Sequence, residues 1–311
     1  MNYFNLKHGL PCETELDGRY KLVEVIGQGG AASIYKAFQM DIECEVAVKI
    51  VTADFGKEVL RRNFEERLHT EAVASAKIKH PNVVGIRAYA PKMHLKHGDH
   101  EEMIPRPYLV MDYLEGLDLS AELWRNGPMA PDRALRLLLP CLDAMSIAHD
   151  HQIIHKDLKP ENLLIRWPHH AYRETMVVMD FGVARHGDAA TIQGQVPFTP
   201  NYCAPEYIRD QIVTPALDVY QLGLILVEML TGHPVVNDDH PVQCLRRHVK
   251  GELNLPQWLL DGPLGDIVTA AVDRDHTARV PTAGALLRLL RRVKPERVLI
   301  PPEILHSHRR R

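Results

Sequence analysis

Ile154-His155-Lys156-Asp157-Leu158-Lys159-Pro160-Glu161-Asn162 is the stretch that decides the fold, and Met179-Asp180-Phe181-Gly182 follows it. The first stretch places a carboxylate, a lysine and an amide within one short loop. The second adds another carboxylate directly after a predicted strand, Met176–Met179. Together they supply a base, a phosphate ligand and two hard-oxygen ligands for a metal. Any one tetrapeptide could arise by chance, but the longer first stretch is more specific, and both stretches in this order indicate one catalytic apparatus.

A glycine cluster, Gly27-Gln28-Gly29-Gly30-Ala31-Ala32, lies upstream between the predicted strands Tyr20–Ile26 and Ile34–Phe38. Glycines let the backbone approach phosphate oxygens closely and present N–H groups to them. A plain hairpin turn is the alternative. A dinucleotide-binding fold is disfavoured, because a strand pattern and not a helix follows the glycines.

A third predicted strand, Glu45–Ile50, carries Lys49 near its end, where the ammonium can pair with phosphate as a point charge. The lysine needs an acidic partner, and the following predicted helix, residues 56–78, offers Glu71. Glu65 and Glu66 on the same helix are rival partners.

The second half of the chain is predicted to be mainly helical. An apolar stripe from Ala134 to Met145 recurs at helical spacing, although Pro140 conflicts with it and predicts a kink. Val219–Leu230 is apolar nearly all round and predicts a buried helix, and a last amphipathic helix is predicted over Pro281–Val293. Strands Val83–Tyr89 and Tyr108–Tyr113 belong to the first half, so a hinge is expected at residues 112–116.

Composition excludes several functional classes. The 311 residues include 37 Lys and Arg against 40 Asp and Glu, and this balance disfavours a nucleic-acid binder. The five cysteines are scattered, which predicts reduced thiols in a cytoplasm. No secretory signal is visible, and the longest apolar stretch is too short to span a bilayer.

Residues 91–107 form a polar segment that carries His94, His97 and His100. Three histidines at this spacing are compatible with a metal site. A long hairpin loop is the favoured interpretation, and its length also raises the hypothesis of a docking site.

These motifs resemble those of the eukaryotic-type (Hanks-type) serine/threonine protein kinases, and the bacterial members most closely. The resemblance extends from about Tyr20 to about Val293. It implies an α+β, bilobal fold: residues 1–113 form a small β-rich lobe with an N-terminal extension, residues 114–300 form a larger helical lobe, and residues 301–311 form a polar basic tail. It also implies transfer of the γ-phosphoryl group of ATP to protein serine or threonine hydroxyls, with autophosphorylation, Mg²⁺ as cofactor and Mn²⁺ as an alternative. A cytoplasmic location without a membrane span is expected, and a regulatory partner protein is left open.

The resemblance implies catalytic roles for Asp157, Lys159, Asn162, Lys49, Glu71 and Thr199, and a metal-binding role for Asp180. Asp157 would orient the substrate hydroxyl as catalytic base, and Lys159 would contact the γ-phosphoryl group. Thr199 resembles the threonine that contacts both of them. Lys49 would bind the α- and β-phosphates and pair with Glu71, while magnesium would be held by Asn162 and Asp180.

The same resemblance implies an ATP site. Gly27, Gly29 and Gly30 match the phosphate-covering loop, whereas Ala32 stands where a third glycine is usual. Met111 is expected beside the adenine, and the Asp112 carbonyl and the Leu114 N–H are expected to bond its edge. The remaining expected nucleotide contacts are Ile26, Ile34, Ala47, Lys49, Asp118 at the ribose, and Leu164.

Structural and regulatory roles follow from the resemblance as well. Glu206 is expected to pair with Arg279, Asp218 to brace the catalytic loop, and Phe181 and Gly182 to complete the metal-binding motif. Between Asp180 and Glu206 the only serine or threonine residues are Thr191 and Thr199, which makes Thr191 the regulatory candidate.

One departure from the family pattern concerns Lys156, which replaces the usual arginine before Asp157. A lysine lacks the planar fork that binds a phosphate bidentately. We therefore hypothesise weaker dependence on phosphorylation of the activation segment.

A pseudokinase and a small-molecule phosphotransferase are the two rival functions. A pseudokinase usually lacks one of the essential groups, but Lys49, Asp157, Asn162 and Asp180 are all present. A small-molecule phosphotransferase of related fold generally lacks the segment Ala204-Pro205-Glu206. Both rivals are therefore disfavoured.

Overall fold

The computed structural model describes residues 4, 6, 9–29, 32–52, 58–167, 173–181 and 200–306. The side chains of residues 58–61, 63, 64, 67, 71, 305 and 306 are outside this description. The chain divides into two compact units. Unit 1 contains residues 1–79 and 84–115, and unit 2 contains residues 80–83 and 116–311.

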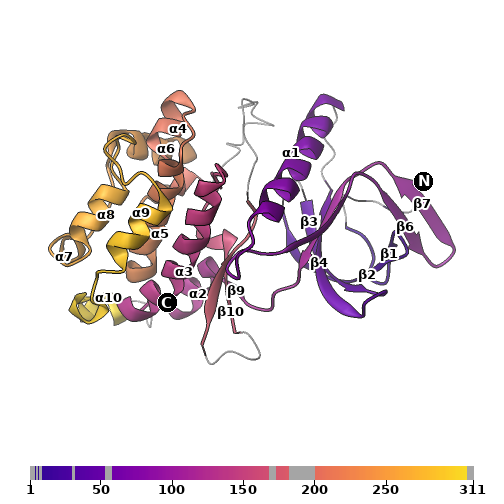
Figure 1. The fold of residues 1–311 in the computed structure, drawn as a ribbon, viewed down its shortest axis with the longest axis horizontal. Helices are drawn as coiled ribbons and strands as arrows, with labels where there is room; N and C mark the ends of the chain where they lie inside the picture. The colour runs from indigo at the N-terminus through magenta and orange to yellow at the C-terminus, as the bar shows by residue number, and fades with distance from the viewer. Residues whose placement is uncertain are drawn as a thin grey trace. The chain divides into compact units, whose positions relative to one another are not determined.

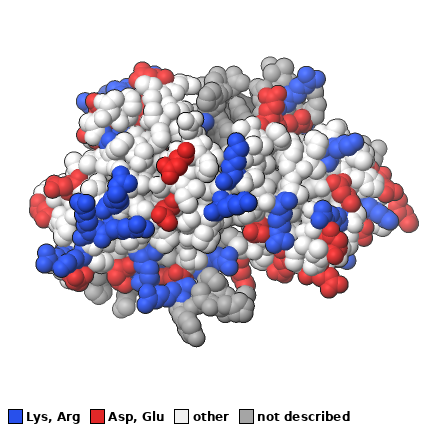
Figure 2. All heavy atoms as spheres, in the orientation of Figure 1, with Lys and Arg blue, Asp and Glu red and all other residues white. Residues whose placement is uncertain are grey.

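Unit 1 is a curled antiparallel sheet with one helix (Figure 1). Its elements are β1 (Glu15–Leu16), β2 (Tyr20–Gln28), β3 (Ala32–Gln39), β4 (Cys44–Val51), α1 (Glu58–Lys77), β5 (Ile86–Ala90), β6 (Met93–His97), β7 (His100–Ile104) and β8 (Tyr108–Asp112). The eight strands follow the order β5-β8-β4-β3-β2-β1-β6-β7. Figure 2 shows acidic and basic side chains interspersed over the face of this unit that it draws.

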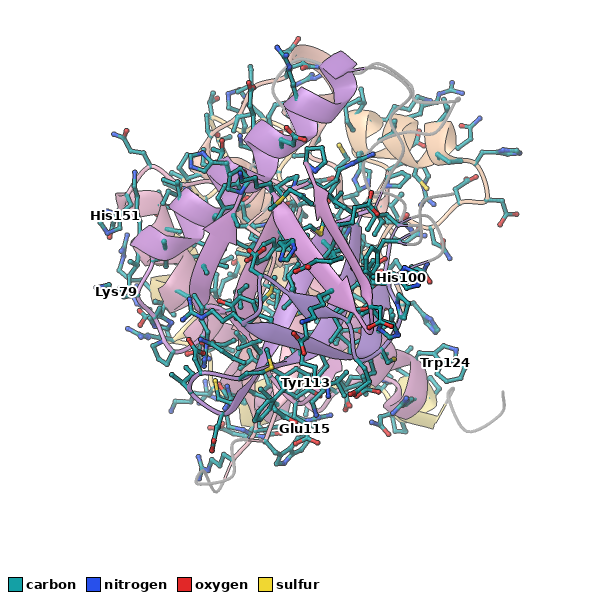
Figure 3. The ribbon with its side chains drawn as sticks, turned by 90° about the vertical axis from the view of Figure 1, so that its right-hand side faces the viewer. Lys79, His100, Tyr113, Glu115, Trp124 and His151 are labelled. Carbon is teal, nitrogen blue, oxygen red and sulfur yellow. The ribbon has the colours of Figure 1, made fainter. Side chains whose placement is uncertain are left out.

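Residues 91–107, predicted to form a long hairpin loop, do form a hairpin, but its two arms are the paired strands β6 and β7. Leu95 of β6 lies opposite Leu16 of β1, so the hairpin extends the sheet. Met93, Leu95 and Ile104 are buried in the core of unit 1. His100, labelled in Figure 3, stands at the hairpin turn opposite His97. No group of three potential metal ligands among His, Cys, Asp and Glu occurs within the described residues.

The N-terminal extension belongs to the same core. Phe4 and Leu10 are buried beside Tyr35 of β3. The Leu10 N–H donates to the Tyr35 hydroxyl at 2.7 Å. The hairpin and the extension therefore contribute to one hydrophobic cluster together with inward-facing residues of β2, β3, β4 and β8.

Unit 2 is mainly helical, which together with unit 1 confirms the predicted α+β class. Its elements are β9 (Leu117–Asp118), α2 (Leu119–Asn126), α3 (Pro131–Asp150), η2 (Pro160–Asn162), β10 (Leu163–Arg166), β11 (Thr175–Val178), η3 (Pro200–Tyr202), α4 (Pro205–Asp210), α5 (Pro215–Thr231), α6 (Pro241–Lys250), α7 (Gln257–Leu260), α8 (Gly265–Ala271), α9 (Ala283–Leu290), η4 (Pro295–Arg297) and α10 (Pro302–His306). The η elements are short 3₁₀ helices. The strands form a small sheet in the order β11-β10-β9.

Helix α5 lies at the centre of unit 2. Its residues from Ala216 to Leu230 are all buried, and it packs against α3, α8 and α9. Helix α3 continues through Pro140. Within the described ranges, no helix combines the length and the apolar character needed to cross a bilayer. Within the predicted tail, residues 301–311, the described part contains the short helix α10, and residues 307–311 lie outside the description.

Candidate active site

Asp218, near the start of α5, holds the loop that carries Asp157. One carboxylate oxygen accepts a hydrogen bond from the His155 N–H at 2.9 Å, and the other accepts one from the Lys156 N–H at 2.8 Å. The imidazole Nε2 of His149 lies 2.9 Å from the same carboxylate. Asp218 is fully buried, and such a carboxylate is tolerated only when it is well hydrogen-bonded. The brace expected from the resemblance is therefore present, whereas the part of His149 was not predicted.

Gln221 adds a second support from the same helix. Its Oε1 accepts from the Leu158 N–H at 3.0 Å, and its Nε2 donates to the Lys156 carbonyl at 3.2 Å. It also donates to the Tyr202 carbonyl at 3.2 Å. Because Gln221 lies three residues after Asp218, both side chains project from one face of the helix. Asp157 is thus flanked on both sides by backbone groups that α5 fixes.

Three side chains meet within the loop itself. The ammonium of Lys159 lies 3.1 Å from Oδ2 of Asp157. Nδ2 of Asn162 donates to the Asp157 carbonyl at 2.7 Å. Since the amide nitrogen of Asn162 is used in this way, its Oδ1 is the group left to act as a hard-oxygen ligand. Together with the carboxylate of Asp180, this donor set fits magnesium.

His155 connects the catalytic loop to the motif at Asp180. Its Nε2 lies 2.9 Å from the Met179 carbonyl, and its ring centroid is 4.9 Å from that of Phe181. Both side chains are almost completely buried. Lys156 and Asp180 have left-handed backbone angles, with φ of 69° and 49°. Such conformations in residues other than glycine concentrate at functional sites.

Burial also affects Lys156. It lowers the pKa of the ammonium below its ordinary value, and the nearby charge of Asp218 partly opposes this shift.

Glu206 and Arg279 form the expected ion pair. Two parallel hydrogen bonds of 2.7 and 2.8 Å join the guanidinium to the carboxylate, and both side chains are fully buried. Arg279 also donates to the carbonyls of Ala216 and Asp273 at 2.9 and 2.8 Å. Bidentate geometry and satisfied donors are what a buried pair requires. The pair fixes the first turn of α4 at Glu206, which directly follows Ala204-Pro205.

The strand register of unit 1 gathers several expected nucleotide residues on one face of the sheet. Lys49 lies opposite Ile34, and Ala47 lies opposite Met111. Directly opposed residues of antiparallel strands share a face, and Ala47 and Lys49 are two residues apart on β4. Val46, Val48 and Ile50 alternate with them and enter the core cluster. Gly27 lies opposite Ile34, so the glycine turn borders the same face.

The expected hinge follows β8. The Asp112 N–H donates to the Gly85 carbonyl at 2.8 Å, and its carboxylate accepts from Nε of Arg87 at 2.7 Å. Met111 is buried. Tyr113 and Glu115, labelled in Figure 3, follow on either side of Leu114 as the last residues of unit 1.

Asp118 already has a structural contact. Its carboxylate caps α2 by accepting a hydrogen bond from the Ala121 N–H at 2.7 Å. Leu164 of β10 lies directly opposite Asp118. Ile26 of β2 is substantially exposed.

Several predicted site residues lie outside the described residues. They are Gly30, Gly182, Thr191 and Thr199, and in the case of Glu71 the side chain. The predicted pairing of Lys49 with Glu71 therefore stays a prediction. The alternative pairings of Lys49 with Glu65 and with Glu66 stay predictions as well.

Comparisons with known proteins point to one family. A family model for the protein kinase domain matches residues 20–288. The chain is 31% identical over 301 residues to serine/threonine-protein kinase PknB of Mycolicibacterium smegmatis, covering 93% of this chain and 45% of that protein. It is 32% identical over 288 residues to PknB of Mycobacterium tuberculosis, covering 90% and 44%. It is 31% identical over 273 residues to serine/threonine-protein kinase PrkC of Bacillus subtilis, covering 86% and 39%. The chain thus spans less than half the length of these relatives.

Proposed function

Because the chain belongs to the protein kinase family, we propose that it transfers the γ-phosphoryl group of ATP to serine or threonine hydroxyls of proteins. The observation that carries the proposal is the catalytic loop. Asp157, Lys159 and Asn162 contact one another there, and two polar side chains of α5 hold its backbone. The choice of acceptor is supported by the similar proteins, which are named serine/threonine-protein kinases.

Phosphoryl transfer requires mainly alignment and charge neutralisation from the protein. In the proposed mechanism Asp157 accepts a hydrogen bond from the substrate hydroxyl and orients it. The ammonium of Lys159, already paired to Asp157, would face the transferred group, and Lys49 would neutralise charge on the other phosphates. Asn162 and Asp180 would hold Mg²⁺, which supplies further charge neutralisation when bound.

We also propose a cytoplasmic location and autophosphorylation. The five cysteines support a reducing compartment, because none of them forms a disulfide. Lys156 supports activity without phosphorylation at Thr191. In that case Thr191→Ala should retain activity on an added protein, and its loss in that variant would contradict this part of the proposal.

The function is tested by transfer from γ-labelled ATP with Mg²⁺ to the chain itself and to myelin basic protein, a generic acceptor. Asp157→Asn should lower turnover by roughly 10²- to 10⁴-fold, the range for removing a general base. Asp150→Asn, an exposed position at the end of α3, is the matched control and should stay active. Absence of transfer by the wild type, with ATP still bound, would contradict the proposal and favour a scaffold.

A further inference from the structure

The side-chain amide of Gln221 binds three backbone groups from two separate segments of the chain. Its Oε1 accepts a hydrogen bond from the Leu158 N–H at 3.0 Å, and its Nε2 donates to the carbonyls of Lys156 and Tyr202, each at 3.2 Å. A primary amide has two N–H donors, so each carbonyl receives one of them. Turning the amide over would set its oxygen against two carbonyls and its nitrogen against an N–H group. The partners therefore specify an amide at this position and one orientation of it.

Two of the three bonds flank Asp157. The Lys156 carbonyl belongs to the peptide unit that precedes the α-carbon of Asp157, and the Leu158 N–H belongs to the peptide unit that follows it. Peptide units are planar, so only two backbone dihedral angles at Asp157 set the orientation of one unit relative to the other. Because one planar amide binds both units, it restrains both angles. It thereby sets the direction in which the Asp157 side chain leaves the backbone.

This placement distinguishes Gln221 from the other side chains that hold the loop. Asp218 accepts from the N–H groups of His155 and Lys156, which precede both of these peptide units. Asn162 donates to the Asp157 carbonyl, which belongs to the second unit only. Among these three described side chains, Gln221 alone contacts the peptide units on both sides of Asp157.

The third bond joins the loop to Tyr202 of η3. The hydroxyl at the other end of Tyr202 donates to Glu228 at 2.6 Å. Glu228 follows Gln221 by seven residues, about two turns of α5, so Tyr202 is bound to the same helix through its carbonyl and through its hydroxyl. The bonds of Gln221 to Leu158 and Tyr202 are both buried, and their loss would leave polar groups unsatisfied. The backbones at Asp157 and at Tyr202 are thus held by one shared amide.

We propose that Gln221 is a positioning residue for phosphoryl transfer, which sets the backbone of Asp157 and ties it to the carbonyl of Tyr202. The inference rests on the proposed function in taking Asp157 as the group that orients the acceptor hydroxyl. None of the three partners of Gln221 is among the residues expected to bind ATP. Loss of its bonds should therefore slow transfer without weakening the use of ATP.

Gln221→Met keeps the approximate length and volume of the side chain and removes all three bonds. We expect kcat with myelin basic protein to fall about 10- to 100-fold, as for a misplaced reacting group, and KM for ATP to stay within about twofold of the wild-type value. A merely structural role would lower the amount of folded enzyme and leave its kcat unchanged. Gln243→Met, at an exposed position of α6, is the matched control and should keep the wild-type kcat. Wild-type kcat in folded Gln221→Met would overturn the proposal.

Gln221→Glu separates the acceptor of the amide from its donors. A carboxylate can accept from Leu158 but sets a negative charge against the two carbonyls, whereas a protonated carboxyl regains one donor. Burial favours the protonated form, so kcat of this variant relative to the wild type should rise several-fold as the pH is lowered from about 8 to about 6. The same ratio should stay constant for Gln221→Met. A constant ratio in Gln221→Glu would contradict the donor roles and with them the proposal.

Amide hydrogen exchange tests the contact apart from activity. In the wild type the Leu158 N–H should exchange as slowly as that of Leu224 in the buried part of α5, and it should exchange faster in Gln221→Met. If the wild type shows no transfer, the proposed function fails, and slow exchange at Leu158 still supports the contact. If neither variant folds, the exchange of the wild type decides. Exchange at Leu158 as fast as at Asp239, in an exposed loop, would refute the inference.

Discussion

Asp218 illustrates how one buried side chain controls a loop far away in sequence. Its carboxylate accepts hydrogen bonds from two consecutive backbone N–H groups that directly precede Asp157. Hydrogen bonds to a charged group contribute roughly 1.5–3 kcal/mol each, more than neutral ones. The geometry of the catalytic loop therefore depends on the charge of Asp218 as well as on its shape.

Asp218→Asn is predicted to lower turnover and to reduce the free energy of unfolding by about 1–3 kcal/mol, because an amide nitrogen would face N–H donors. Steady-state kinetics and denaturant unfolding measure the two effects. Asp150→Asn, an exposed control, should change neither. Wild-type turnover in Asp218→Asn would show that the loop keeps its geometry without this charge.

Glu228 links stability to pH. Burial raises the pKa of its carboxyl from the ordinary 4.5 to about 7, although the hydrogen bond from Tyr202 opposes the shift. Between these two values the native state retains a proton that the unfolded chain has lost. The unfolded state then binds fewer protons, so stability falls as pH rises. The contribution is complete below about pH 4.5 and is lost as pH rises through about 7.

We expect Glu228 to contribute a decrease in the free energy of unfolding between about pH 5 and pH 8, with a slope below the limit of about 1.4 kcal/mol per pH unit for one proton. The buried His248 of α6, whose pKa burial lowers to about 4, contributes in the opposite direction below about pH 6.5. The contribution of Glu228 is therefore measured as the difference between the wild type and Glu228→Gln, in which the amide does not titrate. Denaturant unfolding at several pH values checks the prediction, with the exposed Glu296→Gln as control. If the free energy of unfolding of Glu228→Gln depended on pH in the same way as that of the wild type, groups other than Glu228 would be responsible for the dependence.

At the scale of elements, the β6–β7 hairpin shows where pattern-based prediction fails. Its sequence, Met93-His94-Leu95-Lys96-His97 and onward, is polar on its outer side and pairs with a strand of only two residues, β1. The pairing joins segments about eighty residues apart, which no local pattern reveals. The longer elements were predictable because alternation and helical periodicity are local. In α3, the burial of Leu137, Leu138 and Cys141 maintains the helix through Pro140.

The hairpin is predicted to contribute to the stability of unit 1. Leu95→Ala should lower the free energy of unfolding by about 2–5 kcal/mol, since Leu95 is fully buried in the core cluster. Met103→Ala on β7, where the side chain is 53% exposed, should change it by less than about 0.5 kcal/mol. Denaturant unfolding of both variants makes the comparison. Equal small effects would show that the hairpin contributes little to the stability of unit 1.

At the scale of the whole molecule, the sequence could identify site residues only where they form motifs. Asp157, Asn162 and Asp180 stand in compact signatures, and the strand pattern placed Lys49 on a strand of unit 1. His149 and Gln221 support the same loop but lie outside any signature, because their partners are brought to them by the packing of α3 and α5. Most residues proposed to bind the nucleotide, including Lys49, belong to unit 1. The residues proposed to orient the acceptor and to hold the metal, Asp157, Asn162 and Asp180, belong to unit 2.

This division of roles makes nucleotide binding and phosphoryl transfer separable by mutation. A ligand that binds only the native state stabilises it by about 2.7 kcal/mol at a concentration of 100 times Kd, which raises the unfolding temperature by a few degrees. Mg-ATP should raise the unfolding temperature of the wild type and of Asp157→Asn equally, because Asp157 is proposed to orient the acceptor and not to hold ATP. Lys49→Met should lose most of this shift together with transfer, because it removes the cation proposed to face the phosphates. A full shift in Lys49→Met would contradict that role, and a lost shift in Asp157→Asn would show that the catalytic loop contributes to ATP binding itself.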